Sequence, residues 1–198
     1  MSDIPNRPYV FVKERVGMFK AANAYDLFDE HENPIGKVEE DIPNAFVKML
    51  KFTGMKPMLP FRVHFYDADG KVYMTLRRKF TIGRSMVFLD DEDGRTIGQY
   101  KQKLFAFKPK FWILSPEGQE IGEVQGDWKG WDFTVIDKDQ QPVGKVTKKW
   151  AGIGKELFTT ADNYVIAAEQ GVSVEPDFRK LAFAAGICID MVLKEQNK

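Results

Sequence analysis

Lysine is the residue type whose spacing most clearly suggests a chemistry in this chain. Its ε-ammonium group is a compact positive charge that attracts phosphate and other anions. Each basic residue near a negatively charged membrane surface contributes about 1 kcal/mol of attraction. We interpret two groups of lysines as a binding site for anionic lipid headgroups, although lysines at strand ends also serve to protect sheet edges. The residues of this candidate site are Lys101, Lys103, Lys108, Lys110, Lys145, Lys148 and Lys149.

A second candidate membrane contact is the segment 43–60, which we expect to be a helical or irregular insertion. Phe46, Met49 and Phe52 belong to an apolar stripe with lysines interspersed, a pattern that occurs in helices lying in a membrane interface. The same stripe would also suit a cap over one mouth of a barrel. A further basic group, Arg77-Arg78-Lys79, ends a predicted strand and has the same two interpretations as the lysines.

The residue types that perform catalysis do not form a recognisable set. His31 lies in an acidic turn and His64 alternates with polar residues in a strand, so neither is placed as a general base. Cys188 falls in an apolar stretch, where burial disfavours the reactive thiolate. Carboxylate pairs such as Asp90-Asp91 are interpreted as solvated turn residues. No glycine-rich phosphate loop links a strand to a helix, so we expect a non-enzymatic protein with no catalytic residue and no cofactor.

Composition argues against several other classes of function. The 198 residues include 29 basic and 29 acidic side chains, and a nucleic-acid partner usually requires a basic excess. One cysteine and two histidines leave no internal disulfide, no thiolate zinc cluster and no three-histidine metal site. The first ten residues lack the apolar stretch of a signal peptide. We therefore expect a cytoplasmic protein without a transmembrane span, whose partner is an anionic membrane surface.

The elements that position these residues repeat along the chain. Each of five segments contains an alternating strand, an acidic or glycine turn and a second strand, which predicts a β-hairpin. In four of them an aliphatic residue and a glycine follow the turn, as in Ile97-Gly98 and Val143-Gly144. Glycine at such a place favours a bulge or the close approach of another backbone. The five segments are 25–40, 61–78, 86–103, 111–128 and 133–150.

Consecutive hairpins predict a meander that closes on itself, because closure removes the unpaired edges of a sheet. Further strands near 10–12 and 157–167 would bring the number to about twelve, which is wide enough to hold a helix. We therefore predict an all-β fold class: one domain over 1–198, with a closed antiparallel barrel around a buried C-terminal hydrophobic helix.

The predicted central helix is the segment 177–194. Its residues 181–189 are apolar on every face, which is typical of a helix buried in protein. The uncharged run is too short for a bilayer, which requires about 20 residues. We expect Asp177 to cap the helix. Asp190, the acid inside the apolar part, is expected either near the barrel mouth or paired with Lys194 one turn later.

These features together resemble the Tubby-like superfamily, and within it the phospholipid scramblase and LURP-one-related group. The resemblance rests on Val143-Gly144-Lys145-Val146, on Lys149-Trp150, on the stretch ELFTTADNY at 156–164 and on Ile189-Asp190 inside the helix. It implies a twelve-stranded barrel around a hydrophobic helix, and a binding module for anionic phospholipid or phosphoinositide. Lipid transport of the scramblase type and a protein-interaction scaffold are the alternatives.

The chain departs from the scramblase pattern in two respects. It shows neither the proline-rich N-terminal region nor the cysteine cluster that is lipidated in scramblases, and stable anchoring by acyl chains needs two signals. The family's proposed calcium loop is also incomplete. Thr160, Tyr164 and Gly171 stand where a calcium loop favours acidic oxygen donors, which leaves the carboxylate of Asp162. We therefore expect no metal site.

Overall fold

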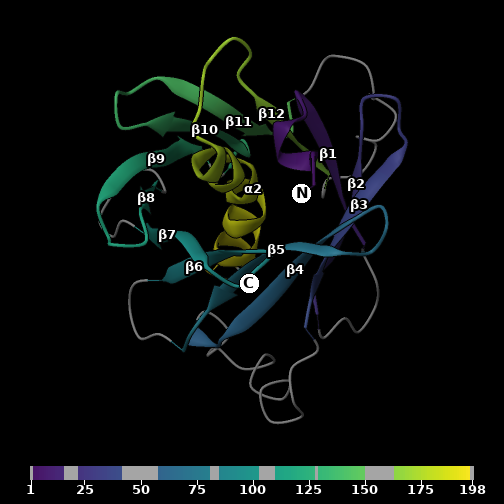
Figure 1. Ribbon diagram of the computed structural model, residues 1–198, viewed down its shortest axis with the longest axis horizontal. Coiled ribbons are helices and arrows are strands. Elements are labelled where there is room, and N and C mark those ends of the chain that lie inside the picture. Colours follow the sequence, from purple (N-terminus) through teal and green to yellow (C-terminus); the bar gives the residue numbers. More distant parts are fainter. Residues whose placement is uncertain are drawn as a thin grey trace.

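The described residues form a closed barrel with a helix inside it (Figure 1). The computed structural model describes residues 2–15, 22–41, 58–80, 85–102, 110–127, 129–149 and 163–196. Twelve antiparallel strands follow one another around the barrel in chain order, and β1 pairs with β12 to close it. The predicted fold class is confirmed. The elements are η1 (Ile4–Asn6), β1 (Tyr9–Glu14), β2 (Ala24–Phe28), β3 (Pro34–Glu40), β4 (Phe61–Asp67), β5 (Val72–Arg78), β6 (Met86–Asp91), β7 (Thr96–Gln102), β8 (Lys110–Leu114), β9 (Glu120–Asp127), β10 (Asp132–Asp137), β11 (Pro142–Thr147), β12 (Tyr164–Ala168) and α2 (Pro176–Gln196).

All five predicted hairpins are present, as β2–β3, β4–β5, β6–β7, β8–β9 and β10–β11. Their alternation follows from the pleat of a strand, which points successive side chains to opposite faces. In β4, for example, Val63 and Phe65 are buried in the barrel, whereas Arg62 and His64 lie on its outer face. The apolar residues of the alternating pattern therefore make the core.

One turn geometry is repeated in the five hairpins. A side-chain oxygen of the first turn residue accepts hydrogen bonds from the N–H groups two and four residues later. The fourth turn residue has a positive φ, as at Gly70 (78°) and Gly118 (88°), a backbone conformation that favours glycine. A shift of register follows each turn, which confirms the predicted bulge. The first residues of the five turns are Asp29, Asp67, Asp91, Ser115 and Asp137.

The glycines that follow the turns give the helix room inside the barrel. A Cβ atom on Gly98 would lie 2.6 Å from Leu181 Cδ1, and one on Gly122 would lie 2.6 Å from Phe178 Cζ. Gly144 is less crowded, since its Cβ would lie 4.0 Å from that of Ala182. The backbone that comes close to these glycines is that of the neighbouring strand: a Cβ atom would lie 2.9 Å from the Leu114 carbonyl oxygen at Gly98 and 2.5 Å from that of Ile136 at Gly122. The predicted close approach of a backbone is therefore confirmed, and α2 adds a close approach of side chains.

From Leu181 to Val192 helix α2 is buried on every side, as its composition predicts. Leu181, Ala185 and Ile187 are completely inaccessible to solvent. The helix begins one residue earlier than predicted, at Pro176, and Glu175 caps it by accepting a hydrogen bond from the Phe178 N–H at 2.9 Å. The prediction that Asp177 is the cap is therefore wrong: a proline at the first helical position suits that place because its missing N–H would have no partner there.

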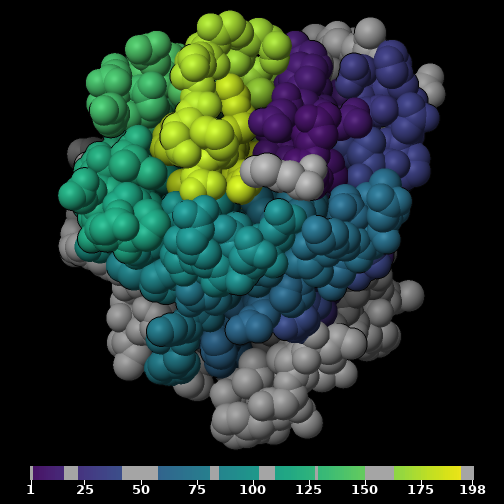
Figure 2. All heavy atoms as spheres, in the orientation of Figure 1, coloured from purple at the N-terminus to yellow at the C-terminus, as the bar shows by residue number. Residues whose placement is uncertain are grey.

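The barrel has two different ends. The five hairpin turns lie at one of them, which we call the turn end; the connections β1–β2, β3–β4, β5–β6, β7–β8, β9–β10 and β11–β12 join strands at the other, the loop end. Figure 2 shows η1 (purple) and the first turns of α2 (yellow) side by side in the opening of the turn end. Segment 42–57, which holds most of the predicted insertion, lies outside the described residues.

Candidate functional site

The predicted lipid site lies on the outer face of the barrel, towards the loop end. Lys101 is the last outward-facing residue of β7, and Lys110 is the first residue of β8. Lys101 stands opposite Trp112, two residues beyond Lys110 on the same face, so the two lysines are diagonal neighbours. Lys103 and Lys108 lie outside the described residues.

The second lysine group is farther away around the barrel. A row of directly opposed residues runs from Lys110 through Gln125 and Thr134 to Lys145. Three steps between strands separate the Cα atoms of Lys110 and Lys145 by about 14 Å. Exposed charges at that separation are largely screened at physiological salt, where the Debye length is about 8 Å. The structure therefore brings Lys101 and Lys110 together and places Lys145 apart from them.

Carboxylates accompany two of these lysines. Lys110 Nζ lies 2.7 Å from Glu123 Oε1, and Lys145 Nζ lies 3.1 Å from Asp132 Oδ1. Ion pairs on an exposed surface are weak, at about 0–1 kcal/mol, so an anion of higher charge density can compete for either ammonium group. The net positive potential of the row is nevertheless lower than the count of lysines suggests.

The two lysines after β11 lie at the loop end. Lys148 Nζ stands 4.7 Å from the centroid of the Trp131 ring, close enough for a cation–π interaction. Lys149 is exposed, and its backbone N–H donates to Thr147 Oγ1 at 3.0 Å. A Cβ atom on Gly130 would lie 3.2 Å from Lys149 Nζ, so both side chains stand beside the β9–β10 connection.

Strand alternation separates the predicted group Arg77-Arg78-Lys79. Arg77 lies on the outer face and binds Asp90 through its guanidinium group, with Nε 2.5 Å from Oδ2. Arg78 points inward, is 3% exposed, and donates to the carbonyl oxygen of Leu59. Lys79, just beyond the strand, is exposed. These three residues do not form one patch.

The prediction that the pair Asp90-Asp91 is solvated is wrong. Asp90 and Asp91 are 7% and 8% exposed. Asp90 also accepts a hydrogen bond from Thr96 Oγ1 at 2.7 Å, and Asp91 is the first residue of its turn. Both carboxylates are therefore occupied in holding the β6–β7 hairpin, because a buried carboxylate requires hydrogen-bonding partners.

The residues considered for catalysis have structural partners. His64 Nδ1 lies 3.0 Å from Thr75 Oγ1, and its Nε2 lies 3.2 Å from Asp41 Oδ1. Cys188 is 1% exposed in the helix, and burial raises the pKa of its thiol well above the ordinary value. Both observations agree with the structural interpretation of these residues.

No metal-ligating group of three His, Cys, Asp or Glu side chains occurs in the described part of the chain. Of the residues aligned with the calcium loop, Thr160 and Asp162 lie outside the described ranges, and Tyr164 faces the barrel interior with 0% exposure. Among the described residues, no helix is both long and apolar enough to cross a membrane.

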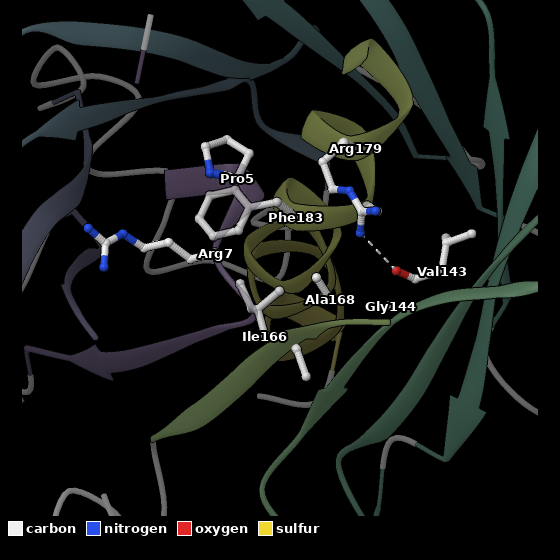
Figure 3. A pocket seen from close by; sticks show the side chains of 10 residues that line it. Pro5, Arg7, Val143, Gly144, Ile166, Ala168, Arg179 and Phe183 are labelled. Carbon is white, nitrogen blue, oxygen red and sulfur yellow. Dashed lines mark hydrogen bonds between the residues drawn. The ribbon is translucent and has the colours of Figure 1, made fainter. Parts of the chain in front are cut away.

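A small hollow opens between η1, β12 and α2 at the turn end (Figure 3). Arg179 spans it from the helix, donating to the carbonyl oxygens of Val143 at 3.3 Å and Val172 at 3.2 Å, and burial lowers the pKa of its guanidinium group. The volume of the hollow, about 10 Å³, is barely enough for one water molecule. It is therefore too small to be a ligand site.

Sequence analysis missed one residue of the loop end. Phe80 is 54% exposed and is the large hydrophobic side chain that stands out from the surface of the described residues. It follows Lys79 directly, two residues after β5 ends. Phe80 lies beyond the end of the strand, where the barrel wall no longer provides an interior for its ring. An aromatic residue just after a predicted strand was therefore the available sequence signal.

Several known proteins are similar to this chain. A family model described as Scramblase matches residues 12–196. "Altered inheritance rate of mitochondria protein 25" of Saccharomyces cerevisiae is 25% identical over 194 residues, which cover 82% of this chain and 59% of that protein. Phospholipid scramblase 1 of Homo sapiens is 27% identical over 157 residues, covering 71% of this chain and 48% of the human protein. The chain spans about half the length of the curated relatives that it matches.

One solved structure is similar over the whole chain. The X-ray structure of a protein from Arabidopsis thaliana superposes with a TM-score of 0.51 and 14% sequence identity, covering 100% of this chain and 99% of that one. At this identity the likeness shows the fold alone.

Proposed function

This chain belongs to the scramblase family, and from that premise we propose that it binds anionic phospholipid, phosphoinositides included, at a membrane surface without a catalytic step. The observation that carries the proposal is the position of Lys101, Lys110, Lys148 and Lys149 on the outer face or rim of the barrel, all towards its loop end. A membrane can approach this end of the barrel, whereas α2 fills the interior.

The expected binding is weak and electrostatic. With about 1 kcal/mol for each basic residue, the five described lysines of the site supply at most about 5 kcal/mol, and Glu123 and Asp132 lower that sum. A free energy of about 4 kcal/mol corresponds to a millimolar dissociation constant. Such an interaction depends on the density of charge in the membrane and on the salt concentration.

Vesicle co-sedimentation tests this function. Vesicles with phosphatidylserine or a phosphoinositide should bind the chain at low salt and release it as the salt concentration rises through 0.15 M, where screening shortens the reach of exposed charges to about 8 Å. Vesicles of phosphatidylcholine alone should bind little. Equal binding to neutral and anionic vesicles, or binding to neither at low salt, would contradict the proposal and favour a protein-interaction scaffold.

Changing the neighbouring pair Lys101 and Lys110 to glutamate should weaken this binding at least about tenfold, because two positive charges become negative ones. The thermal melt should change little, since both side chains lie on the outer face. The matched control is Lys71→Glu, at an exposed lysine of the β4–β5 turn at the opposite end of the barrel. It should leave vesicle binding unaltered.

A second candidate is the movement of phospholipid between the two leaflets of a membrane, and the names of several relatives favour it. Dithionite quenching of labelled lipid in proteoliposomes distinguishes it from binding. If the chain transports lipid, the protected inner-leaflet fluorescence falls when dithionite is added; if it only binds lipid, that fluorescence persists while co-sedimentation is positive.

A further inference from the structure

Charge is segregated between the two ends of the barrel although the whole chain is neutral. Each of the five hairpin turns, counted from its first residue to its fifth, has a net negative charge, and so has the link 169–175 before α2. By contrast, the described residues of the connections at the loop end carry more basic than acidic side chains: Arg15, Lys79, Lys129, Lys148 and Lys149 against Asp41.

This segregation creates a dipole along the barrel axis. A negative surface attracts the loop end and repels the turn end, so it orients the molecule before contact. The side wall offers no such preference. There Glu123 and Asp132 stand beside lysines of neighbouring strands, and the fields of the opposite charges cancel over short distances.

The described residues of the loop end combine exposed charge with an exposed aromatic ring. Arg62 is exposed on the outer face of β4, directly opposite Arg77 on β5. Lys79 is exposed one residue beyond β5, and Phe80 follows it with 54% of its surface accessible. Basic residues beside a protruding aromatic side chain are the pattern of a surface that contacts headgroups and the acyl boundary together.

We propose that the barrel docks end-on, with the loop end against an anionic bilayer, Arg62 and Lys79 among the headgroups, and Phe80 inserted at the acyl boundary. The inference rests on the proposed lipid-binding function and adds to it a docking face and an orientation. The acidic turn end, together with the start of α2, then points away from the membrane.

An environment-sensitive fluorophore tests the orientation. Phe80→Cys provides one labelling site and Asp69→Cys, at an exposed position of the β4–β5 turn, provides the matched site at the other end. The native Cys188 is 1% exposed with a raised thiol pKa, so it does not compete for the label. On phosphatidylserine vesicles at low salt, a nitrobenzoxadiazole label at 80 should brighten several-fold and be quenched by spin-labelled lipid, while a label at 69 should not change.

Charge reversal provides an independent measurement that retains Phe80. The double change Arg62→Glu and Lys79→Glu should lower the affinity for phosphatidylserine vesicles at least about tenfold. Lys138→Glu, an exposed lysine of the β10–β11 turn, should leave the affinity unchanged. All three residues are exposed, so the melting temperature should stay the same and verify folding.

The outcomes separate this inference from the function on which it rests. If the unmodified chain fails to co-sediment with phosphatidylserine vesicles, both fall. If it co-sediments but the label at 69 responds as strongly as the label at 80, or Lys138→Glu weakens binding as much as the loop-end change, end-on docking alone is wrong. A response to soluble polyglutamate equal to that with vesicles would instead identify an acidic protein as the partner.

Discussion

The buried tyrosines show how single residues depend on partners that are distant in sequence. Tyr25 donates its hydroxyl proton to Asp190 Oδ2 at 2.5 Å, and both side chains are at most 1% exposed. Burial, together with the charge of Asp190, raises the pKa of Tyr25 well above its ordinary value, so the phenol stays protonated and remains a donor. Asp190 therefore lies inside the barrel against the loop-end part of β2. The partner of this buried carboxylate comes from the wall that surrounds it.

A pair of tyrosine substitutions tests this hydrogen bond. Tyr25→Phe should lower the free energy of unfolding by about 1–3 kcal/mol, because it removes the donor to a buried carboxylate. Tyr73→Phe is the matched control, since the Tyr73 hydroxyl is buried with no hydrogen-bond partner in the described structure, and it should cost nothing or stabilise slightly. Urea unfolding at pH 7 gives both values. Equal losses of unfolding free energy in the two variants would show that the hydrogen bond from Tyr25 to Asp190 does not stabilise the fold.

The first residues of the turns carry a pH dependence. Burial tends to raise the pKa of Asp91, but hydrogen bonds from Arg95 and from the backbone outweigh it and the net pKa is lowered. A carboxyl group with a lowered pKa stabilises the folded state above its unfolded pKa of about 3.9. That contribution disappears as the pH falls through the folded pKa.

Asp91→Ala should therefore reduce stability by about 1–2 kcal/mol at pH 7, where two backbone N–H groups lose their acceptor. The difference from the unmodified chain should shrink as the pH falls below about 4. Asp93→Ala in the same turn is the control, because Asp93 contributes its N–H rather than its carboxylate to the turn. Thermal melts at a series of pH values measure both. A difference for Asp91→Ala that is independent of pH would refute the electrostatic part of this account.

At the scale of elements, the fold depends on the fit of α2 against the glycines of the wall. Three hairpins present glycine to the helix at Gly98, Gly122 and Gly144. In the β4–β5 hairpin, the residue at the corresponding position is Met74 rather than glycine. The inner face of the wall is therefore lined by small residues at three hairpins and by a large residue at β5. Helix α2 lies nearest to β7, β11 and β12. Its side chains also reach β9 at Gly122, β4 at Phe65 and β2 at Tyr25.

Two alanine substitutions measure that fit. Gly122→Ala should destabilise the protein by about 1–3 kcal/mol, because the new Cβ would lie 2.5 Å from the Ile136 carbonyl oxygen and 2.6 Å from Phe178 Cζ. Gly144→Ala should cost less, since its nearest atom is the Ala167 carbonyl oxygen at 3.2 Å. Chemical denaturation ranks the two. A larger loss of stability for Gly144→Ala than for Gly122→Ala would show that the spacing between wall and helix does not determine the cost of a side chain at these positions.

At the scale of the whole molecule, the barrel and its helix share one core. Phe183 lies 6.0 Å from Phe65 between ring centroids and is 4% exposed. A wall of twelve strands encloses more space than its own inward side chains fill, so α2 is required to complete the packing. We therefore propose that the chain unfolds as a single domain.

Shortening the chain at Asp177 should accordingly leave a protein that is insoluble or lacks a cooperative melt. A milder version compares two phenylalanines: Phe183→Ala should cost about 3–5 kcal/mol, whereas Phe80→Ala, at a side chain that is 54% exposed, should cost little. Calorimetry of the variants checks both. A soluble truncated chain with a sharp transition would mean that the barrel folds without its helix.

The sequence by itself determined the periodic features of this protein. Alternating polarity, acidic turns and glycines after the turns predicted five hairpins, their bulges and the buried helix, because each of these depends on neighbours within a few residues. The lysines of the candidate site could also be named from the sequence, since lysine is kept at the surface by its charge.

Only the tertiary structure decided which residues meet. Closure of the barrel separated Lys145 from Lys110, turned Arg78 inward and Arg77 outward, and joined Tyr25 to Asp190. It also brought the described basic residues Lys79, Lys129, Lys148 and Lys149 to one end and every acidic hairpin turn to the other, although these residues alternate along the chain. The physical reason is that an antiparallel meander returns each second connection to the same end. Charges of opposite sign that alternate along the sequence are therefore collected at opposite ends of the barrel.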